Sequence, residues 1–315
     1  MLRVRIGDLA LETPVLTASG TFGHDGKATA FLRPGELGGL VLKTVTPRPR
    51  PGNPLPRLVE TPAGMLNSIG LENRGVEAFL RETLPLLEPL AMPVVANIGG
   101  ESVAEFVTMI EAFGGLERFA AIEINLSCPN VGGGSLPFSS SPDAVAEVVS
   151  ACRARTDKPL WAKLSPNVAR IAPLAAAAEQ AGASALTVCN TLLGLVVDWR
   201  TRKPALGAGY GGLSGPAVRP VAMRMVWEAH KAVSIPVVAS GGAVCADDVL
   251  QFLVAGASAV QVGSGVFRRP DLFARITAEL RELLGAEGLR ATDLVGTLDW
   301  PQASPAQRRL GCAEG

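Results

Sequence analysis

A lone cysteine is the first residue whose setting could support chemistry. Cys128 stands between Ser127 and Pro129 in the stretch EINLSCPN, residues 123–130, just after an apolar run. A partly ionised thiol can take a proton from a bound molecule, although buried cysteines are often inert packing. The chain has two histidines, His24 in a glycine-rich loop and His230 late in a predicted helix, where we expect a surface position. Because the G-x-S-x-G elbow of serine hydrolases is also missing, Cys128 is the best acid–base candidate.

Polar residues and glycines close a series of short apolar runs. They are Ser19, Lys43, Asn97, Asn125, Lys163, Asn190, Gly241–Gly242 and Gly263–Ser264. Any one of these polar groups could pair with loop backbone, but together they need partners, and no carboxylate partner is obvious. A ligand rich in donors and acceptors would satisfy them. The segments ASGG and VGSG each precede a predicted helix, which favours a phosphate-bearing cofactor, although each alone is explained by turn glycines.

The apolar runs alternate with amphipathic segments. Strands are expected at 14–19, 39–44, 93–98, 121–127, 160–165, 185–191, 236–242 and 259–265. Helices are expected at 102–113, 142–155, 168–181, 217–233, 246–255 and 271–284. This order predicts an α/β fold, a (β/α)₈ TIM barrel with an N-terminal hairpin at Gly7-Asp8; a doubly wound open sheet is the alternative. We expect one domain over residues 1–315, with the strand-end residues meeting at one rim.

Several segments lie outside this alternation. The Pro- and Gly-rich stretches 45–75 and 190–215 are expected to be long loops over the C-terminal face of the barrel. The segment GAGYGG, residues 207–212, fits G-x-G-x-x-G but lacks a flanking strand and helix, so we interpret it as a flexible loop. Residues from about 290 onward are weakly patterned and predict a loosely held tail.

The composition narrows the function classes. Lys plus Arg and Asp plus Glu are both 29, which gives no electrostatic argument for nucleic acid or an anionic membrane. The five cysteines are widely spaced, so no metal or iron–sulfur site is expected. The charged, alternating N-terminus is not a signal peptide, and a reduced cytoplasmic setting fits the odd cysteine count.

Long motifs in this sequence resemble class 1 dihydroorotate dehydrogenases from PVLTASGTFG to about Phe273. They are GMLNSIGLEN, INLSCPN, WAKLSPN, CNTLLG, GGLSGPA and GSGVF, and the first is most similar to the class 1B catalytic subunit. The resemblance implies non-covalent FMN across the C-terminal rim. The implied flavin contacts are Ser19, Lys43, Thr44, Asn97, Asn125, Lys163, Cys189, Gly215, Gly241, Gly242, Gly263 and Ser264. The implied dihydroorotate contacts are Lys43, Asn67, Ser68, Ile69, Gly70, Leu71, Asn125, Asn190 and Thr191, with Asn130 as a further contact.

The resemblance also implies a reaction. Cys128 would remove the C5 proton of dihydroorotate while the C6 hydride passes to flavin N5, giving orotate for pyrimidine biosynthesis. Class 1B further implies a homodimer with a partner subunit that carries FAD and a [2Fe–2S] cluster and passes electrons to NAD, a heterotetramer. The alternatives are a class 1A-like enzyme that reduces fumarate, another flavin barrel acting on a different pyrimidine, and a non-catalytic barrel that binds a phosphate ligand. The loop VGGGSLPFSS departs from the family, which usually has a basic residue and a glycine after the phenylalanine, and Cys189 replaces a more usual aliphatic residue.

Overall fold

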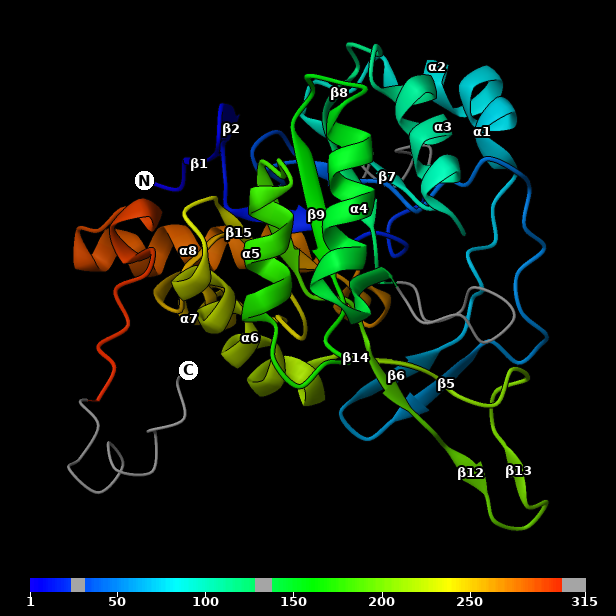
Figure 1. Ribbon diagram of the computed structural model, residues 1–315. Helices are drawn as coiled ribbons and strands as arrows, with labels where there is room; N and C mark the ends of the chain where they lie inside the picture. The colour runs from blue at the N-terminus through cyan, green and yellow to red at the C-terminus, as the bar shows by residue number, and fades with distance from the viewer. Residues whose placement is uncertain (24–31, 128–137, 302–315) are drawn as a thin grey trace, which may run out of the picture.

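Eight parallel strands form the centre of the molecule. The computed structural model describes residues 1–23, 32–127 and 138–301 (Figure 1). The strand order is β3-β16-β15-β10-β9-β8-β7-β4. The bounds are β3 Val15–Thr17, β4 Leu40–Val41, β7 Val94–Ile98, β8 Phe119–Asn125, β9 Leu160–Leu164, β10 Ala185–Val188, β15 Val237–Ser240 and β16 Ala257–Val262. A parallel bridge between Leu16 and Gly39 joins the two outer strands, and Gly38 N donates to Val15 O at 2.8 Å. The predicted (β/α)₈ barrel is therefore confirmed.

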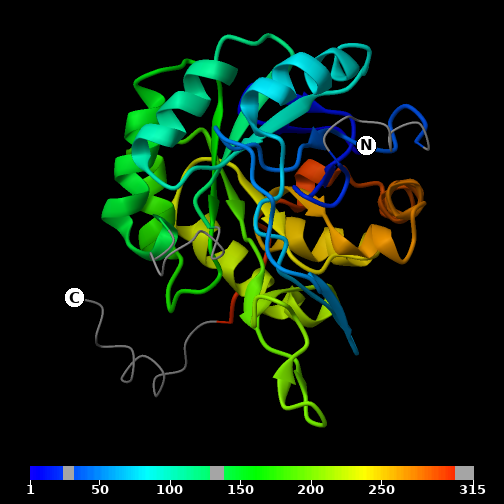
Figure 2. The same cartoon turned by 90° about the vertical axis from the view of Figure 1, so that its right-hand side faces the viewer.

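Helices surround the strands, as both views show (Figures 1 and 2). The six predicted helices are α3 Val103–Phe113, α4 Pro142–Arg153, α5 Ala172–Gln180, α6 Arg219–Ala232, α7 Ala246–Val254 and α8 Leu272–Glu287. Short 3₁₀ turns are η3 Phe138–Ser140, η4 Pro216–Val218, η5 Ser264–Phe267 and η6 Ala291–Leu294. In α3, Ser102 caps the first turn by accepting from Glu105 N at 3.2 Å. None of the described helices is long and apolar enough to cross a membrane.

One helical segment was not predicted from the sequence. It runs through α1 Gly75–Ala78, the π-helical turn η2 Phe79–Thr83 and α2 Leu84–Leu87, between β6 and β7 in the chain. Pro85 interrupts the apolar pattern of this segment and indicates a break. In the structure Pro85 falls in the first turn of α2, where a missing N–H is tolerated.

The two long stretches expected to be loops instead pair with each other. They form an antiparallel sheet of β11 Leu192–Gly194, β14 Gly211–Ser214, β6 Gly64–Asn67 and β5 Leu58–Thr61, called here the cover sheet. A two-stranded arm, β12 Val197–Asp198 and β13 Lys203–Pro204, projects from it (Figure 2). The expected flexible loop at 207–212 is partly wrong, because Gly211 and Gly212 lie in β14. A Cβ on Gly211 would lie 2.5 Å from Asn67 O, so the close approach of β6 requires glycine there.

Both ends of the described chain pack against the barrel. The predicted hairpin is present as β1 Val4–Ile6 and β2 Leu9–Leu11, and its apolar side chains join the core. At the other end, Ala291 is buried and its N–H donates to Met1 O at 3.0 Å. Trp300 stacks on Trp227 with ring centroids 4.1 Å apart. Ala291 and Trp300 therefore pack against residues of the N-terminus and of α6, whereas 302–315 lie outside the described residues, and the loosely held tail stays a prediction.

His230 is not the surface residue that the sequence suggested. It is half-buried, and a Cβ on Gly296 would lie 2.5 Å from its Nε2. Burial lowers the pKa of His230. The glycine at 296 lets the C-terminal segment cross directly over this ring, a contact between residues far apart in the sequence.

Candidate functional site

A cavity of about 340 Å³ opens where the barrel strands end, beneath the cover sheet. Most residues expected to bind a ligand line it: Ser19, Lys43, Thr44, Asn67, Ile69, Gly70, Leu71, Asn125, Lys163, Cys189, Asn190, Thr191, Gly215, Gly241, Gly242, Gly263 and Ser264. Its size is typical of small-molecule sites. Parallel strands bring their carboxyl ends to one rim, which is why residues so far apart in sequence meet here.

Two expected contacts do not line this cavity. Asn97 is fully buried below it and donates to Glu123 Oε1 at 2.6 Å. Ser68 is also fully buried, and its Oγ accepts from Asn53 Nδ2 at 2.8 Å. Ser68 directly follows β6 in the chain, and successive side chains of extended backbone point to opposite sides, so Ser68 turns away where Asn67 faces the cavity. Cys128, Asn130 and His24 lie outside the described residues.

A glycine cradle forms one wall of the cavity. At Gly241 a Cβ would lie 2.6 Å from Ala222 Cβ, and at Gly242 a Cβ would lie 2.7 Å from Gly215 O. Gly242 has φ of +84°, a conformation that also favours glycine. The amides of Gly242 and Ala243 donate to no acceptor among the described residues. Bare backbone with free N–H groups is suited to binding an anion such as phosphate.

Two cationic side chains face the cavity. Lys43 is half-buried and its Nζ donates to Glu72 O. Burial lowers the pKa of Lys43, and the Glu72 carboxylate partly opposes this shift. Glu72 also lines the cavity, but its carboxylate pairs with Arg57 Nη1 at 2.8 Å, which offsets its negative charge. Lys43 and Lys163 therefore make the cavity favourable for an anionic ligand.

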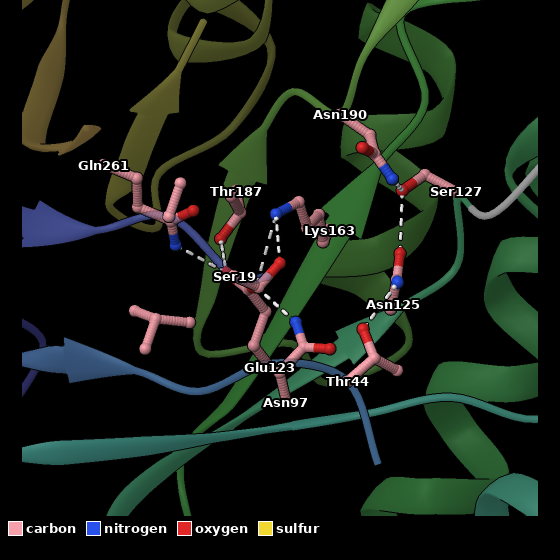
Figure 3. A network of polar contacts seen from close by, with 12 residues as sticks. Ser19, Thr44, Asn97, Glu123, Asn125, Ser127, Lys163, Thr187, Asn190 and Gln261 are labelled. Carbon is pink, nitrogen blue, oxygen red and sulfur yellow. Dashed lines mark hydrogen bonds and ion pairs between the residues drawn. The ribbon is translucent and has the colours of Figure 1, made fainter. Parts of the chain in front are cut away.

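Lys163 has a carboxylate partner that the sequence reading missed. Its ammonium lies 3.6 Å from Glu123 Oε1, and its Nζ donates to Ser19 Oγ at 3.0 Å (Figure 3). The expectation that the polar strand ends share no carboxylate is therefore wrong for Lys163 and Asn97. An acid in the middle of an otherwise apolar strand, AIEIN, was the available signal.

A second chain of hydrogen bonds fixes the asparagines (Figure 3). Asn190 Nδ2 donates to Ser127 Oγ at 2.8 Å, and Ser127 Oγ donates to Asn125 Oδ1 at 2.9 Å. Asn125 Nδ2 then donates to Thr44 Oγ1 at 3.1 Å. Ser127 is fully buried, so this one hydroxyl sets the orientation of two amides that line the cavity. Its role was not predicted, although it lies in the same motif as Cys128.

Among the described residues, Cys189 is the cysteine that lines the cavity, and it is not suited to proton transfer. Burial raises the pKa of Cys189 to about 12, and the nearby Lys163 charge offsets this only in part. The Cys189 thiol therefore stays protonated near neutral pH and packs as a small apolar side chain.

Comparison with known proteins is consistent with this site. The family model described as dihydroorotate dehydrogenase matches residues 1–284. A protein of Trichlorobacter lovleyi, named the catalytic subunit of dihydroorotate dehydrogenase B (NAD(+)), is 44% identical over 299 residues, covering 95% of this chain and 98% of its own. A protein of Desulforudis audaxviator with the same name is 47% identical over 294 residues, covering 93% of this chain and 96% of its own. A protein of Solibacter usitatus, named "Putative dihydroorotate dehydrogenase A (fumarate)", is 47% identical over 298 residues, with 94% and 98% covered.

Among solved structures, a similar chain is that in a crystal structure of DHODH with ferulenol from Eimeria tenella. The TM-score is 0.80 over 95% of this chain and 89% of that one, with 23% identity, which supports the fold. The family match spans most of the sequence, and the named relatives are aligned over nearly their whole length. The chain therefore belongs to the dihydroorotate dehydrogenase family, a family of oxidoreductases.

Proposed function

We propose that this chain oxidises (S)-dihydroorotate to orotate in pyrimidine biosynthesis, as the catalytic subunit of a class 1B enzyme. The observation that carries the proposal is the cavity itself, in which two ammonium groups and three asparagines face a glycine cradle. Dihydroorotate is an anion with several amide donors and acceptors, which asparagine and lysine side chains can match.

The residues present fit FMN as the cofactor. The free amides of Gly242 and Ala243 suit its phosphate, and a side chain at Gly241 or Gly242 would fill that space. Ser19, Thr44, Asn125, Lys163 and the backbone at Cys189, Gly215, Gly263 and Ser264 would hold the rest of the cofactor. Asn97 would act from below through Glu123. FMN, when bound, supplies the acceptor for the hydride removed from substrate C6.

The other steps belong to the chain's own residues. Lys43 would bind the substrate anion, and the loop from Asn67 to Leu71, with Asn125, Asn190 and Thr191, would orient the ring. Cys128 is proposed to accept the C5 proton. It follows Ser127 directly in the chain, and Ser127 joins the two asparagines that border the cavity. Cys189 cannot take this role because its thiol remains protonated.

The partner proposal follows from the relatives. Several are named catalytic subunits that use NAD(+), which favours an electron-transfer partner over direct use of fumarate. We infer a homodimer joined to subunits with FAD and a [2Fe–2S] cluster, acting in the cytoplasm as one 1–315 domain. Leu195, Val197 and Trp199 on the β12–β13 arm are exposed apolar side chains, as protein interfaces often contain. Fumarate reduction remains the second candidate because the Solibacter relative carries that name.

The test begins with the purified full chain. Acid release should yield about one FMN per chain, and anaerobic dihydroorotate should bleach the flavin. The chain alone should give little NADH, and addition of the electron-transfer subunit should restore NAD reduction. Brisk fumarate reduction by the chain alone would move the proposal to the class 1A reaction, and folded protein without FMN would overturn it.

The base is tested with a matched cysteine. Cys128→Ala should slow flavin reduction about a hundredfold or more while FMN content is retained, as expected for loss of a general base. Cys128→Ser should keep some activity, shifted to higher pH. Cys245→Ala is the control, because Cys245 is a free thiol that does not line the cavity. Wild-type reduction rates in Cys128→Ala would assign Cys128 to packing.

A further inference from the structure

A carboxylate sits at the centre of the barrel, in a layer normally filled by branched apolar side chains. Glu123 is fully buried, and every polar group around it is placed to donate (Figure 3). Its Oε1 accepts from Asn97 Nδ2 at 2.6 Å. Its Oε2 accepts from Thr187 Oγ1 at 2.6 Å and from Gln261 Nε2 at 2.6 Å. With Lys163 near Oε1, both oxygens serve as acceptors, an arrangement that fits the ionised form.

This network presents only one charge to the cavity. Lys163 and Ser19 line the cavity, whereas Glu123, Asn97, Thr187 and Gln261 do not. The Lys163 side chain is 4% exposed and the Glu123 side chain is 0% exposed. A ligand in the cavity therefore meets the ammonium, with the carboxylate directly behind it.

The polar network around Glu123 is not expected to contribute much to the folding stability of the barrel. A buried ion pair usually contributes less to folding than well-packed apolar residues of similar volume. Asn97 Oδ1 and Gln261 Oε1 are also left without a hydrogen-bond partner among the described residues, because both amides turn their N–H groups toward Glu123. Two unpaired buried oxygens add a further destabilising contribution. A role in fixing a charge explains these features better than a role in packing.

We propose that Glu123 is a positioning residue that keeps the Lys163 side chain protonated and directed into the cavity. The consequence for catalysis rests on the proposed function, in which Lys163 would help to hold FMN; an ammonium group there would stabilise the negative charge of the reduced flavin. Among the described residues, the titratable groups that face Lys163 are Glu123 and the neutral thiol of Cys189. Removing the Glu123 charge leaves a buried ammonium with no counter-ion among the residues that the structure describes, and such a group loses its proton more easily.

The first measurement follows Lys163 itself. In the full chain, the ¹³Cε resonance of Lys163 is titrated by NMR, in wild type and in Glu123→Gln. We expect proton affinity to fall about tenfold or more in Glu123→Gln. Thr187→Val is the matched control, because it removes one hydrogen bond to the same carboxylate but leaves the charge. It should lower the free energy of unfolding with little effect on the Lys163 titration.

The second measurement reads the cofactor. The midpoint potential of bound FMN is recorded against pH, and Glu123→Gln should show a new break at the pH where Lys163 loses its proton. In a Lys163→Met background, Glu123→Gln should produce no such break, since the group that titrates is gone. Where Glu123→Gln fails to fold, Glu123→Asp takes its place in the comparison with wild type. The double variant Glu123→Gln/Lys163→Met is then the second protein to measure, because removing both charges leaves no unpaired ion.

The outcomes separate this proposal from the proposed function. Unchanged Lys163 titration and an unchanged potential profile in folded Glu123→Gln, or in folded Glu123→Asp where Glu123→Gln is lost, would overturn the positioning role. A purified chain that holds no FMN would defeat the proposed function, while the Lys163 titration would still decide the role of Glu123.

Discussion

Gly242 is the position where one added methyl group tests the proposed phosphate site most directly. Its φ of +84° costs an alanine about 1–2 kcal/mol relative to glycine. The new Cβ would lie 2.7 Å from Gly215 O and 2.9 Å from Arg219 Cβ, so backbone must shift by some tenths of an ångström. Overpacking of this kind costs about 1–3 kcal/mol, so Gly242→Ala should lower the free energy of unfolding by about 2–5 kcal/mol.

The chain offers a control with the same strain and no collision. Gly209 has φ of +89° and nothing within 4 Å of an added Cβ, and it does not line the cavity. Gly209→Ala should therefore lose only about 1–2 kcal/mol. Urea unfolding gives the stabilities, and quenching of FMN fluorescence by the apo-protein gives affinities. We expect affinity to fall about tenfold or more in Gly242→Ala and to stay unchanged in Gly209→Ala. Equal FMN affinity in both variants would refute the assignment of Gly242 to the phosphate site.

Three further predictions concern residues around the cavity. Because burial lowers the pKa of Lys43, its ammonium is lost at a lower pH than that of a free lysine, so KM for dihydroorotate should rise in the alkaline range. Lys43→Arg should flatten this rise, and an identical pH profile in that variant would contradict the role of Lys43. Ser127→Ala leaves Asn125 Oδ1 and Asn190 Nδ2 without their shared partner, and about 1–3 kcal/mol of stability should be lost. The kcat/KM of Ser127→Ala should also fall about tenfold. If urea unfolding and steady-state kinetics give this variant the stability and kcat/KM of the wild type, the Ser127 hydroxyl does not orient the two asparagines. Iodoacetamide near neutral pH should leave Cys189 unmodified until the chain is unfolded, and rapid labelling of the native chain, seen by peptide mass spectrometry, would contradict its raised pKa.

The sequence alone determined the alternation of strands and helices and most of the rim. Apolar runs such as 160–165 are local signals of strands buried on both faces, and all five residues of β9 are indeed buried. In a parallel barrel every strand delivers its last residues to the same end. Lys43, Asn125 and Lys163 could therefore be grouped without knowing any contact between them.

Tertiary structure decided which of these polar groups meet the ligand and which support it. Glu123 takes partners from four other strands, through Asn97, Lys163, Thr187 and Gln261. No local pattern specifies such a convergence, because it depends on the register of each strand against its neighbour and on which face each residue presents. The same reason explains Asn97, which lies one residue before the end of β7, is fully buried, and does not line the cavity.

The cover sheet and the packing of the C-terminal segment could not be predicted from local sequence patterns, for a related reason. Met65 in β6 pairs with Ser214 in β14, 149 residues further along the chain, and Trp300 stacks on Trp227. Pro and Gly residues predict turns and loops in such stretches, because they report the backbone conformations that are favoured locally. Backbone hydrogen bonds and apolar contacts between distant segments depend on how the barrel places those segments in space, which no local pattern specifies.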